Sequence, residues 1–291
     1  MLKFFEKNFK KKKVKISKTI QIPKISQHGI DMLIDDIGTK VTLKFGNAQH
    51  IGNRENQEDS FGYSNIVNSE ELSQKGAFAV LADGMGGLSH GKQISEYVVS
   101  AANAMFGNFD YTMQIPNQLE NMVYEINKEV SENFYQNGKS IAGSTMIAVL
   151  IYKTKLYWVS IGDSRVYIFR DGLLYQINED HDYYNQLLVQ YMHGEISLDD
   201  AKNNKEKDAL TSFIGNEKLK QIDSNKRGFS LQKNDTIILC SDGVYNSLSN
   251  SELISNLLDD PQPSVEKIVK NIVKKKLPSQ DNLTIMAINY N

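Results

Sequence analysis

A run of apolar residues that ends in a carboxylate and a glycine-rich loop constrains this chain more than any other stretch. Residues 77–82 have the pattern of a buried strand, and Asp83 and Gly84-Met-Gly-Gly follow them directly. A strand in the core is a rigid support, so it would fix the Asp83 carboxylate. The glycines permit positive φ angles and a close approach of the backbone to a ligand. With the Gly84 carbonyl as a further oxygen donor, the stretch suits Mg²⁺ or Mn²⁺ next to a phosphate.

An Asp-Gly pair after a strand also occurs in ordinary hairpin turns, and this alternative applies to Asp83-Gly84. The chain holds a direct comparison in Asp171-Gly172, which lies between two strand-like runs at 166–169 and 173–177. That spacing predicts a plain hairpin turn. Asp83 differs because other acidic residues occupy similar positions elsewhere in the chain.

These acidic residues stand at the ends or starts of predicted strands, or in a turn between strands. They are Glu58, Asp59, Asp163, Asp242 and Asp281. Because no histidine or cysteine accompanies them, oxygen ligation of Mg²⁺ or Mn²⁺ fits better than a zinc site. Carboxylates that converge repel one another and raise one another's pKa, so such a cluster is costly without cations. Two cations there could activate water and polarise a phosphoryl group.

Arg54 precedes the Glu58-Asp59 pair in the sequence. Its planar guanidinium can bind two phosphate oxygens at once. The alternative is a surface arginine without a ligand, and the residue pattern alone leaves both interpretations open.

Periodic apolar residues predict a mixture of strands and helices. Strands are expected at 59–63, 77–82, 145–151, 156–160, 166–169, 173–177, 236–240 and 283–289. Helices are expected after the glycine loop, after Pro116 with Asn117 as the cap, at 253–258 and at 265–272. The turns between residues 145 and 177 are too short for parallel crossovers, so those strands should pair antiparallel. The pattern favours an α+β fold of packed sheets covered by helices.

Charge is distributed unevenly along the chain. The first 20 residues contain eight lysines and one glutamate, whereas the whole chain carries a net charge of −2, so the remainder is acidic. An acidic body argues against a nucleic-acid-binding protein, which needs a basic face. In the basic segment Leu2, Phe5 and Phe9 would share a helical face. It therefore either contacts an anionic membrane surface or an acidic partner, or is a solvated tail.

The single cysteine excludes a disulfide framework and a cysteine-based zinc site. Cys240 ends an apolar run and is expected to be a small core residue in a reducing compartment. No apolar run reaches the roughly 18–20 residues of a membrane span, and the N-terminus lacks the apolar core of a secretory signal. We therefore expect a cytoplasmic protein.

The acidic residues belong to six short motifs. These are Arg54-Glu-Asn-Gln-Glu-Asp59, Asp83-Gly-Met-Gly-Gly87, Gly143-Ser-Thr145, Gly162-Asp-Ser-Arg165, Ser241-Asp-Gly243 and Asp281-Asn282. In this order they resemble the motifs of the bacterial type 2C metal-dependent serine/threonine protein phosphatases, over residues 44–290. The resemblance implies a four-layer α-β-β-α sandwich of two mainly antiparallel sheets flanked by helices, with a binuclear Mn²⁺ or Mg²⁺ centre at one end.

The resemblance also implies how the two ions are held. Asp83 would bridge them, and the Gly84 carbonyl would bind one of them. Asp242 and Asp281 would complete the second site.

Four further roles follow from the same resemblance. Glu58 and Asp59 would hold water molecules at the centre or the metal itself. Asp163 together with Asp242 matches a third ion site of bacterial members. Arg54 matches the phosphate-binding arginine.

The chain departs from the family pattern at several positions. Leu88 stands where many relatives have a histidine, and Met85 stands where eukaryotic members have a histidine that is a proposed general acid. Protonation of the leaving group is therefore not assigned by resemblance. Water at the metal centre is the first candidate, and His181 and His90 are weaker ones.

The function we expect is hydrolysis of phosphoserine and phosphothreonine in proteins by metal-activated water. A catalytically inactive phosphoprotein-binding module of the same fold is the alternative, but it should lack a metal carboxylate and all are present. A cysteine phosphatase needs arginine six residues after its cysteine, whereas Asn246 follows Cys240 at that distance. A calcium-buffering protein of the EF-hand type needs its ligands in one contiguous loop, whereas the acidic residues of this chain are spread from Glu58 to Asp281.

Domain organisation and partners complete the expectations. Residues 1–40 would form a basic N-terminal extension, and 41–291 the phosphatase catalytic domain, with an insertion at about 183–214 that resembles the mobile flap of the family. Partners would be phosphorylated proteins, as targets of a serine/threonine kinase, and a membrane surface or acidic partner through residues 1–20. We expect a monomer that binds no nucleic acid.

Overall fold

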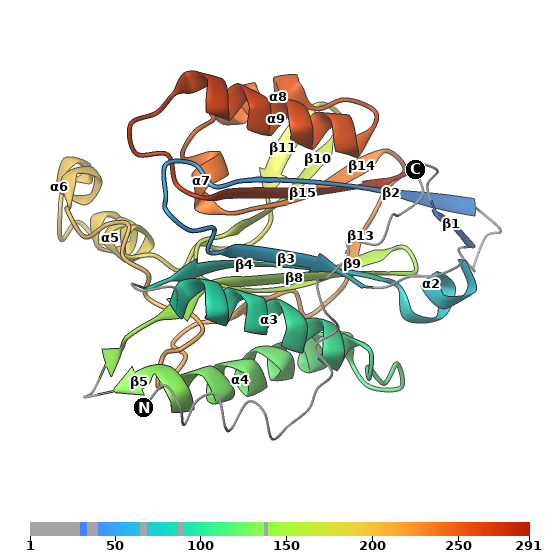
Figure 1. Ribbon diagram of the computed structural model, residues 1–291, viewed down its shortest axis with the longest axis horizontal. Coiled ribbons are helices and arrows are strands. Elements are labelled where there is room, and N and C mark those ends of the chain that lie inside the picture. Colours follow the sequence, from blue (N-terminus) through green and yellow to red (C-terminus); the bar gives the residue numbers. More distant parts are fainter. Residues whose placement is uncertain (1–29, 34–39, 65–68, 87–89, 137–138) are drawn as a thin grey trace.

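The computed structural model describes residues 30–33, 40–64, 69–86, 90–136 and 139–291. Two β-sheets pack face to face, and helices cover the outer face of each (Figure 1). This architecture confirms the predicted α+β sandwich with α-β-β-α layers. The basic segment 1–20, and residues 87–89 after the first glycines of the Asp83 motif, lie outside the described residues.

The first sheet has the strand order β1-β2-β15-β14-β10-β11, and all neighbours are antiparallel. Its strands are β1 (Ile30–Leu33), β2 (Lys40–His50), β15 (Leu283–Tyr290), β14 (Asp235–Cys240), β10 (Arg165–Arg170) and β11 (Leu173–Gln176). The last strand of the chain thus lies in the middle of the sheet. Strand β1 belongs to this sheet although it falls within the stretch 1–40 that we expected to be an extension.

The second sheet has the order β12-β9-β8-β4-β3, with β13 beside β9 and β7 beside β4. Its strands are β12 (Asp223–Ser224), β9 (Lys155–Ile161), β8 (Met146–Tyr152), β4 (Ala77–Met85), β3 (Asp59–Tyr63), β13 (Phe229–Ser230) and β7 (Gly143–Ser144). A small separate pair is formed by β5 (Tyr135–Gln136) and β6 (Lys139–Ser140). Strand β4 is central, as its continuous apolar sequence predicts.

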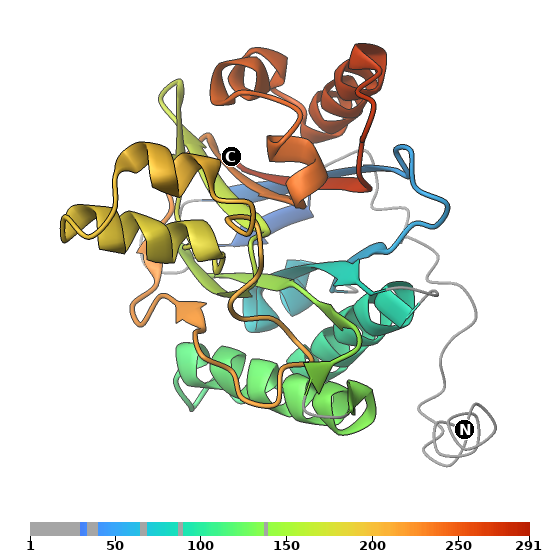
Figure 2. The same ribbon diagram turned by 90° about the vertical axis from the view of Figure 1, so that its left-hand side faces the viewer.

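Helices close both outer faces (Figures 1 and 2). On the second sheet lie α3 (His90–Phe106) and α4 (Ile115–Phe134), and on the first sheet α8 (Asn250–Asn256) and α9 (Pro261–Lys275). The shorter helices are α2 (Ser69–Lys75), α5 (Tyr183–Met192), α6 (Leu198–Asn203) and α7 (Asp242–Tyr245). The prediction of Asn117 as the cap of α4 is wrong. The helix begins two residues earlier, with Pro116 in its first turn, where the missing N–H is tolerated.

Strand β4 shows how alternation builds two separate cores. Phe78, Val80 and Ala82 pack into the core beneath α3 and α4, whereas Ala77, Ala79 and Leu81 pack into the core between the sheets. Side chains of a strand point alternately to its two faces. Asp83 continues the second series, so its carboxylate points towards the seam between the two sheets.

One connection crosses from sheet to sheet, contrary to the expectation for the strands between 145 and 177. The pairs β8–β9 and β10–β11 are antiparallel as predicted, but β10 pairs with β14 and not with β9. The turn Gly162-Asp163-Ser164 carries the chain across, and Gly162 has a φ of 100°. A short turn can join two neighbouring strands of one sheet, and it can equally join two strands that lie above one another in stacked sheets. The length of the turn therefore did not show which sheet β10 would enter.

Candidate active site

The backbone around Asp83 is held by the Gly143-Ser-Thr145 motif. Strand β4 was predicted to end at Ala82. It instead continues to Met85, and its last residues pair with β7. The Asp83 N–H donates to Thr145 Oγ1 at 2.9 Å, and the Asp83 carbonyl accepts from the Thr145 N–H at 2.8 Å and from Ser144 Oγ at 2.9 Å. The carboxylate therefore stands on a fixed piece of sheet rather than on a loop.

Gly84 is required because α3 passes close to the strand. A Cβ atom at this position would lie 2.3 Å from the Gly91 carbonyl oxygen and 2.7 Å from the Glu58 carbonyl oxygen. Both are backbone atoms, and such a contact cannot be relieved by rotating a side chain. The N–H of Gly84 also donates to the Glu58 carbonyl at 3.2 Å, which draws the motif of Arg54–Asp59 against Asp83.

Asp59 lies directly opposite Asp83 in the β3–β4 pair. It is buried, and its Oδ2 accepts hydrogen bonds from Thr284 Oγ1 at 2.7 Å and from Ser241 Oγ at 2.8 Å. Its Oδ1 has no hydrogen-bond partner among the described residues. Burial raises the pKa of Asp59 to about 6, although the bonds from Thr284 and Ser241 act in the opposite direction.

The first sheet delivers Asp242 and Asp281 to the same place. Asp242 follows β14 at the start of α7, and Asp281 precedes β15, the neighbour of β14. Gly243 permits this approach, because a Cβ there would lie 1.9 Å from the Asn282 carbonyl oxygen. Asn282 accepts a hydrogen bond from the Glu58 N–H at 2.7 Å and thereby fastens the Glu58 loop to β15.

The carboxylates perturb one another strongly. Burial raises the pKa of Asp83 well above its ordinary value, and Asp59 and Asp242 raise it further. Burial likewise raises the pKa of Asp242 to about 6 and that of Asp163 to about 7, again with help from neighbouring carboxylates. The pKa of Glu58 is raised too, first by burial.

These side chains surround one pocket of about 500 Å³. Its lining residues are Arg54, Glu55, Asn56, Glu58, Asp83, Gly84, Met85, Gly86, Thr145, Asp163, Asp208, Leu210, Asp242, Asp281 and Asn282. All the predicted site residues line it except Asp59, which is buried behind it. The six motifs therefore meet in space, at the end of the sandwich where β4 and β14 end.

Arg54 is paired in this structure with a residue of the site. Its Nη2 lies 2.5 Å from Asp281 Oδ2, and this hydrogen bond is the main cause that raises the pKa of the guanidinium. Both side chains are partly exposed. A phosphate that binds Arg54 must therefore displace Asp281 from the guanidinium. A cation bound to Asp281 would make this displacement easier.

Neither histidine that we considered as a general acid lines the pocket. His181 is buried, and its Nδ1 accepts a hydrogen bond from the Gly162 N–H at 3.2 Å. Burial lowers its pKa, so it is a neutral support for the crossover turn. His90 starts α3 and packs edge-on against the ring of Phe134.

The segment at 183–214 contributes two pocket residues that were not among the predicted site residues. Asp208 and Leu210 line the pocket from this segment, after α5 and α6. The segment is joined to the body where Ile214 and Ser144 exchange backbone hydrogen bonds of 2.8 and 3.0 Å. Gly194 follows the cap of α5 with a φ of 76°, a conformation that glycine adopts without strain.

The donor set fits hard divalent cations. It consists of carboxylate and carbonyl oxygens, and the unpartnered Oδ1 of Asp59 is the kind of atom that a cation or its water shell satisfies. Within the described residues no three acidic, histidine or cysteine side chains are already arranged around a single point. Instead, Asp59 and Asp163 accept hydrogen bonds from hydroxyl groups, and Asp281 accepts one from Arg54.

Comparison with known proteins decides the family. The chain matches the family described as protein phosphatase 2C over residues 47–280.

The chain belongs to the protein phosphatase 2C family.

Named relatives support this assignment. The serine/threonine phosphatase stp of Listeria welshimeri is 30% identical over 220 residues, which are 73% of this chain and 84% of the relative. The S. agalactiae serine/threonine phosphatase structure has a TM-score of 0.71 at 24% identity and covers 84% of this chain and 98% of its own. The predictions of a type 2C serine/threonine protein phosphatase, and of its fold, are confirmed. Nothing favours the inactive binding module.

A second solved structure concerns the metal. The catalytic domain of serine threonine protein phosphatase PstP, in complex with two manganese ions, has a TM-score of 0.63 at 23% identity and covers 86% of this chain and 99% of its own. Metal dependence is consistent with membership of the protein phosphatase 2C family. None of the helices in the described part of the chain has the length and apolarity that a membrane span requires.

Proposed function

We propose that this phosphatase hydrolyses phosphoserine and phosphothreonine in the pocket around Asp83, with Mn²⁺ or Mg²⁺ held by its carboxylates. The observation that carries the proposal is the convergence of five carboxylates on one pocket, in which Arg54 is the single basic residue among the described lining residues. The carboxylates are those of Glu58, Asp83, Asp163, Asp242 and Asp281. Buried like charges are stable only when protons or cations neutralise them. At neutral pH divalent cations fill that role better than protons.

The proposed metal ligands come from both sheets. They are Glu58, Asp59, Asp83, Gly84, Asp163, Asp242 and Asp281, for two ions and a third at Asp163. When bound, the ions would supply the Lewis acidity that activates water and offsets negative charge on the phosphoryl group. Asp59 lies behind Asp83, so its unpartnered Oδ1 would contact an ion directly or through water.

The pocket favours direct transfer of the phosphoryl group to water. Its described lining contains no serine, cysteine or histidine, and its one hydroxyl side chain, Thr145, is already bonded to the Asp83 N–H and to Ser164. A bond forms between the water oxygen and phosphorus while the bond from phosphorus to the seryl or threonyl oxygen breaks. The water proton passes to that leaving oxygen through a further water molecule, because the described lining of the pocket contains no histidine. Arg54 would leave Asp281 and bind the phosphate oxygens.

A phosphothreonine peptide assayed with Mn²⁺, and with Mn²⁺ plus excess chelator, tests this proposal. We expect turnover only where free metal is present; turnover that resists the chelator would contradict it.

A matched pair of arginine variants tests the phosphate contact. Arg54→Ala should raise KM for the phosphopeptide by about tenfold, the value of one lost charge-assisted contact of about 1.4 kcal/mol. Arg227→Ala removes an exposed arginine outside the pocket and should leave KM unchanged. Equal KM values in the two variants would assign Arg54 to the surface.

Further parts of the proposal concern the rest of the chain. We assign residues 41–291, together with strand β1, to the catalytic domain. We assign the segment 183–214 to a flap, supported by the position of Asp208 and Leu210 in the pocket lining. We assign residues 1–20 to contact with an anionic membrane surface or acidic partner. The substrates would be targets of a serine/threonine kinase, and the enzyme a cytoplasmic monomer. The buried free thiol of Cys240 supports a reducing compartment.

A further inference from the structure

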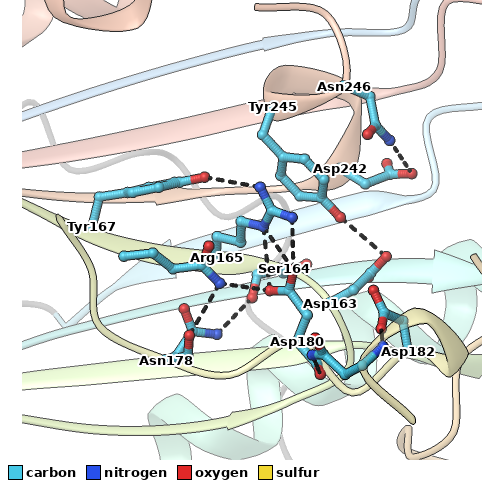
Figure 3. A network of polar contacts seen from close by, with 12 residues as sticks. Asp163, Ser164, Arg165, Tyr167, Asn178, Asp180, Asp182, Asp242, Tyr245 and Asn246 are labelled. Carbon is cyan, nitrogen blue, oxygen red and sulfur yellow. Dashed lines mark hydrogen bonds and ion pairs between the residues drawn. The ribbon is translucent and has the colours of Figure 1, made fainter. Parts of the chain in front are cut away.

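A tyrosine outside the motifs, Tyr245, touches the site from behind. It ends α7, three residues after Asp242, and its hydroxyl donates to Asp163 Oδ2 at 3.1 Å (Figure 3). It does not belong to the pocket lining, whereas Asp163 does. Any influence of Tyr245 on the pocket must therefore pass through Asp163.

The ring of Tyr245 is held in place by Arg165. The guanidinium carbon of Arg165 lies 3.6 Å from the ring centroid, within the range of a cation–π contact (Figure 3). Arg165 is itself fixed by Asp180, because its Nε and Nη2 donate to Asp180 Oδ2 at 2.9 and 2.7 Å. On its other side Arg165 Nη1 donates to the hydroxyl of Tyr167 at 3.3 Å. The phenol is thus aimed before any ligand arrives.

The backbone of Asp163 is fixed by other contacts. Gly162 exchanges two hydrogen bonds with His181, of 2.9 Å and 3.2 Å. Asn178 Nδ2 donates to the Ser164 carbonyl at 3.0 Å, and Asn178 Oδ1 accepts from the Val166 N–H at 2.7 Å. With the turn held in this way, rotation of the Asp163 side chain is the freedom that remains, and the Tyr245 hydroxyl restricts it.

The hydrogen bond is of a kind that persists. A tyrosine hydroxyl ordinarily ionises only near pH 10, so the phenol of Tyr245 is a donor at neutral pH. The bond occupies one oxygen of Asp163 and leaves the other for the pocket. A hydrogen-bond donor that contacts a metal-binding carboxylate in this way commonly changes metal affinity about 10–100-fold.

We propose that Tyr245 is a positioning residue that orients the carboxylate of Asp163 towards a divalent cation in the pocket. The inference rests on the proposed function, since Asp163 needs a fixed orientation only if it is a ligand. Tyr245 lies outside all six motifs and makes no contact with substrate in this assignment.

Two tyrosine-to-phenylalanine variants of the full chain test this role. Tyr245→Phe keeps the ring on Arg165 and removes the bond to Asp163, whereas Tyr167→Phe removes a hydroxyl bonded to the same guanidinium but not to Asp163. Mn²⁺ binding to the metal-free protein is measured by calorimetry, independently of activity. We expect Tyr245→Phe to weaken the lowest-affinity Mn²⁺ site by about tenfold and Tyr167→Phe to leave it unchanged.

The outcomes separate the two levels of the proposal. Wild-type protein that binds Mn²⁺ and is active, with equal Mn²⁺ affinities in the two variants, would refute the role of Tyr245 alone. Wild-type protein that binds no Mn²⁺ would refute the proposed function and the role of Tyr245 with it. Thermal unfolding of the metal-free variants shows whether both still fold.

A double-mutant cycle locates the effect at Asp163. In an Asp163→Ala background the lowest-affinity Mn²⁺ site should be lost, and adding Tyr245→Phe should cause no further change in Mn²⁺ binding. If Tyr245→Phe instead weakens the remaining sites as much as it does in the wild-type background, it acts elsewhere and the proposal is wrong.

Discussion

The same dipeptide, Asp-Gly, occurs in two very different places in this molecule. Asp171-Gly172 forms the exposed turn between β10 and β11, with φ angles of 52° and 79°, as predicted from the flanking strands. Asp83-Gly84 lies inside a strand, between two neighbouring strands and beneath a helix. A Cβ on Gly172 would meet nothing within 4 Å, whereas one on Gly84 would lie 2.3 Å from a backbone oxygen.

The contrast separates two reasons for glycine after aspartate. At Gly172 the reason is the dihedral angle, which L-residues adopt at a cost of about 1–2 kcal/mol. At Gly84 the reason is space, because α3 and the Glu58 loop approach the strand there. The aspartate differs accordingly: Asp171 faces water, whereas Asp83 is aimed at the seam between the sheets and has four carboxylates that raise its pKa.

The largest expected effect comes from exchanging each aspartate for asparagine. Asp83→Asn removes a central charge of the proposed metal centre and should lower kcat by about a thousandfold or more, because Mn²⁺ loses several kcal/mol of anchoring. Asp171→Asn should leave kcat unchanged. Steady-state kinetics on a phosphothreonine peptide measures kcat for both variants. A near-wild-type rate for Asp83→Asn would show that Asp83 is no more important for catalysis than Asp171.

The two glycines should differ in stability. Gly84→Ala forces apart two backbone segments and should lower the free energy of unfolding by about 3 kcal/mol or more. Gly172→Ala should cost only about 1 kcal/mol, since the strain is confined to one exposed residue. Urea unfolding of the metal-free proteins provides both values. Equal losses would show that α3 can shift away from β4 at little cost.

The pH dependence of metal-free stability probes the burial of the acidic residues. Burial raises the pKa of Asp59 and Asp242 to about 6 and that of Asp163 to about 7. The folded state therefore keeps protons that the unfolded chain releases from about pH 4 upwards. Stability should be greatest at low pH within this window and should fall by about 1–2 kcal/mol or more as the pH rises to about 7.

Thermal unfolding in chelator at pH 5 and pH 7.5 measures this fall. Added Mn²⁺ should reverse it at pH 7.5, because cations bind the deprotonated carboxylates. A midpoint that rises with pH in chelator would show that the carboxylates are neutralised in another way.

The order of the helices and strands and the identity of the site residues could be predicted from the sequence. The way in which the two sheets hold these residues could not. Alternation was enough for the apolar part of β4 and for the hairpin at Asp171, because these depend on local patterns. The convergence of Asp83, Asp242 and Asp281 was expected from the resemblance of the ordered motifs to a known family. Asn117 was misjudged because Pro116 can stand inside the first helical turn, so its position does not mark the helix start uniquely.

Features that depend on the packing of distant segments were not predictable. The chain crosses between the sheets at Gly162 because β10 pairs with β14, and a short turn is compatible with either sheet. Asp208 enters the pocket from a polar segment with no motif to mark it. The burial of Asp59 behind the pocket, and the pairing of Arg54 with Asp281, arise only when both sheets are assembled.

The bonds from Asp59 to Ser241 and Thr284 have a consequence for the molecule as a whole. Asp59 starts a strand of the second sheet, whereas Thr284 lies in β15 of the first sheet and Ser241 directly follows β14. The Asp59 carboxylate therefore joins the two sheets at this end of the sandwich. Cations held by carboxylates from both sheets would strengthen this connection. Loading with metal would then slow amide hydrogen exchange along β4 and β14, because the two sheets would be held together more firmly at this end.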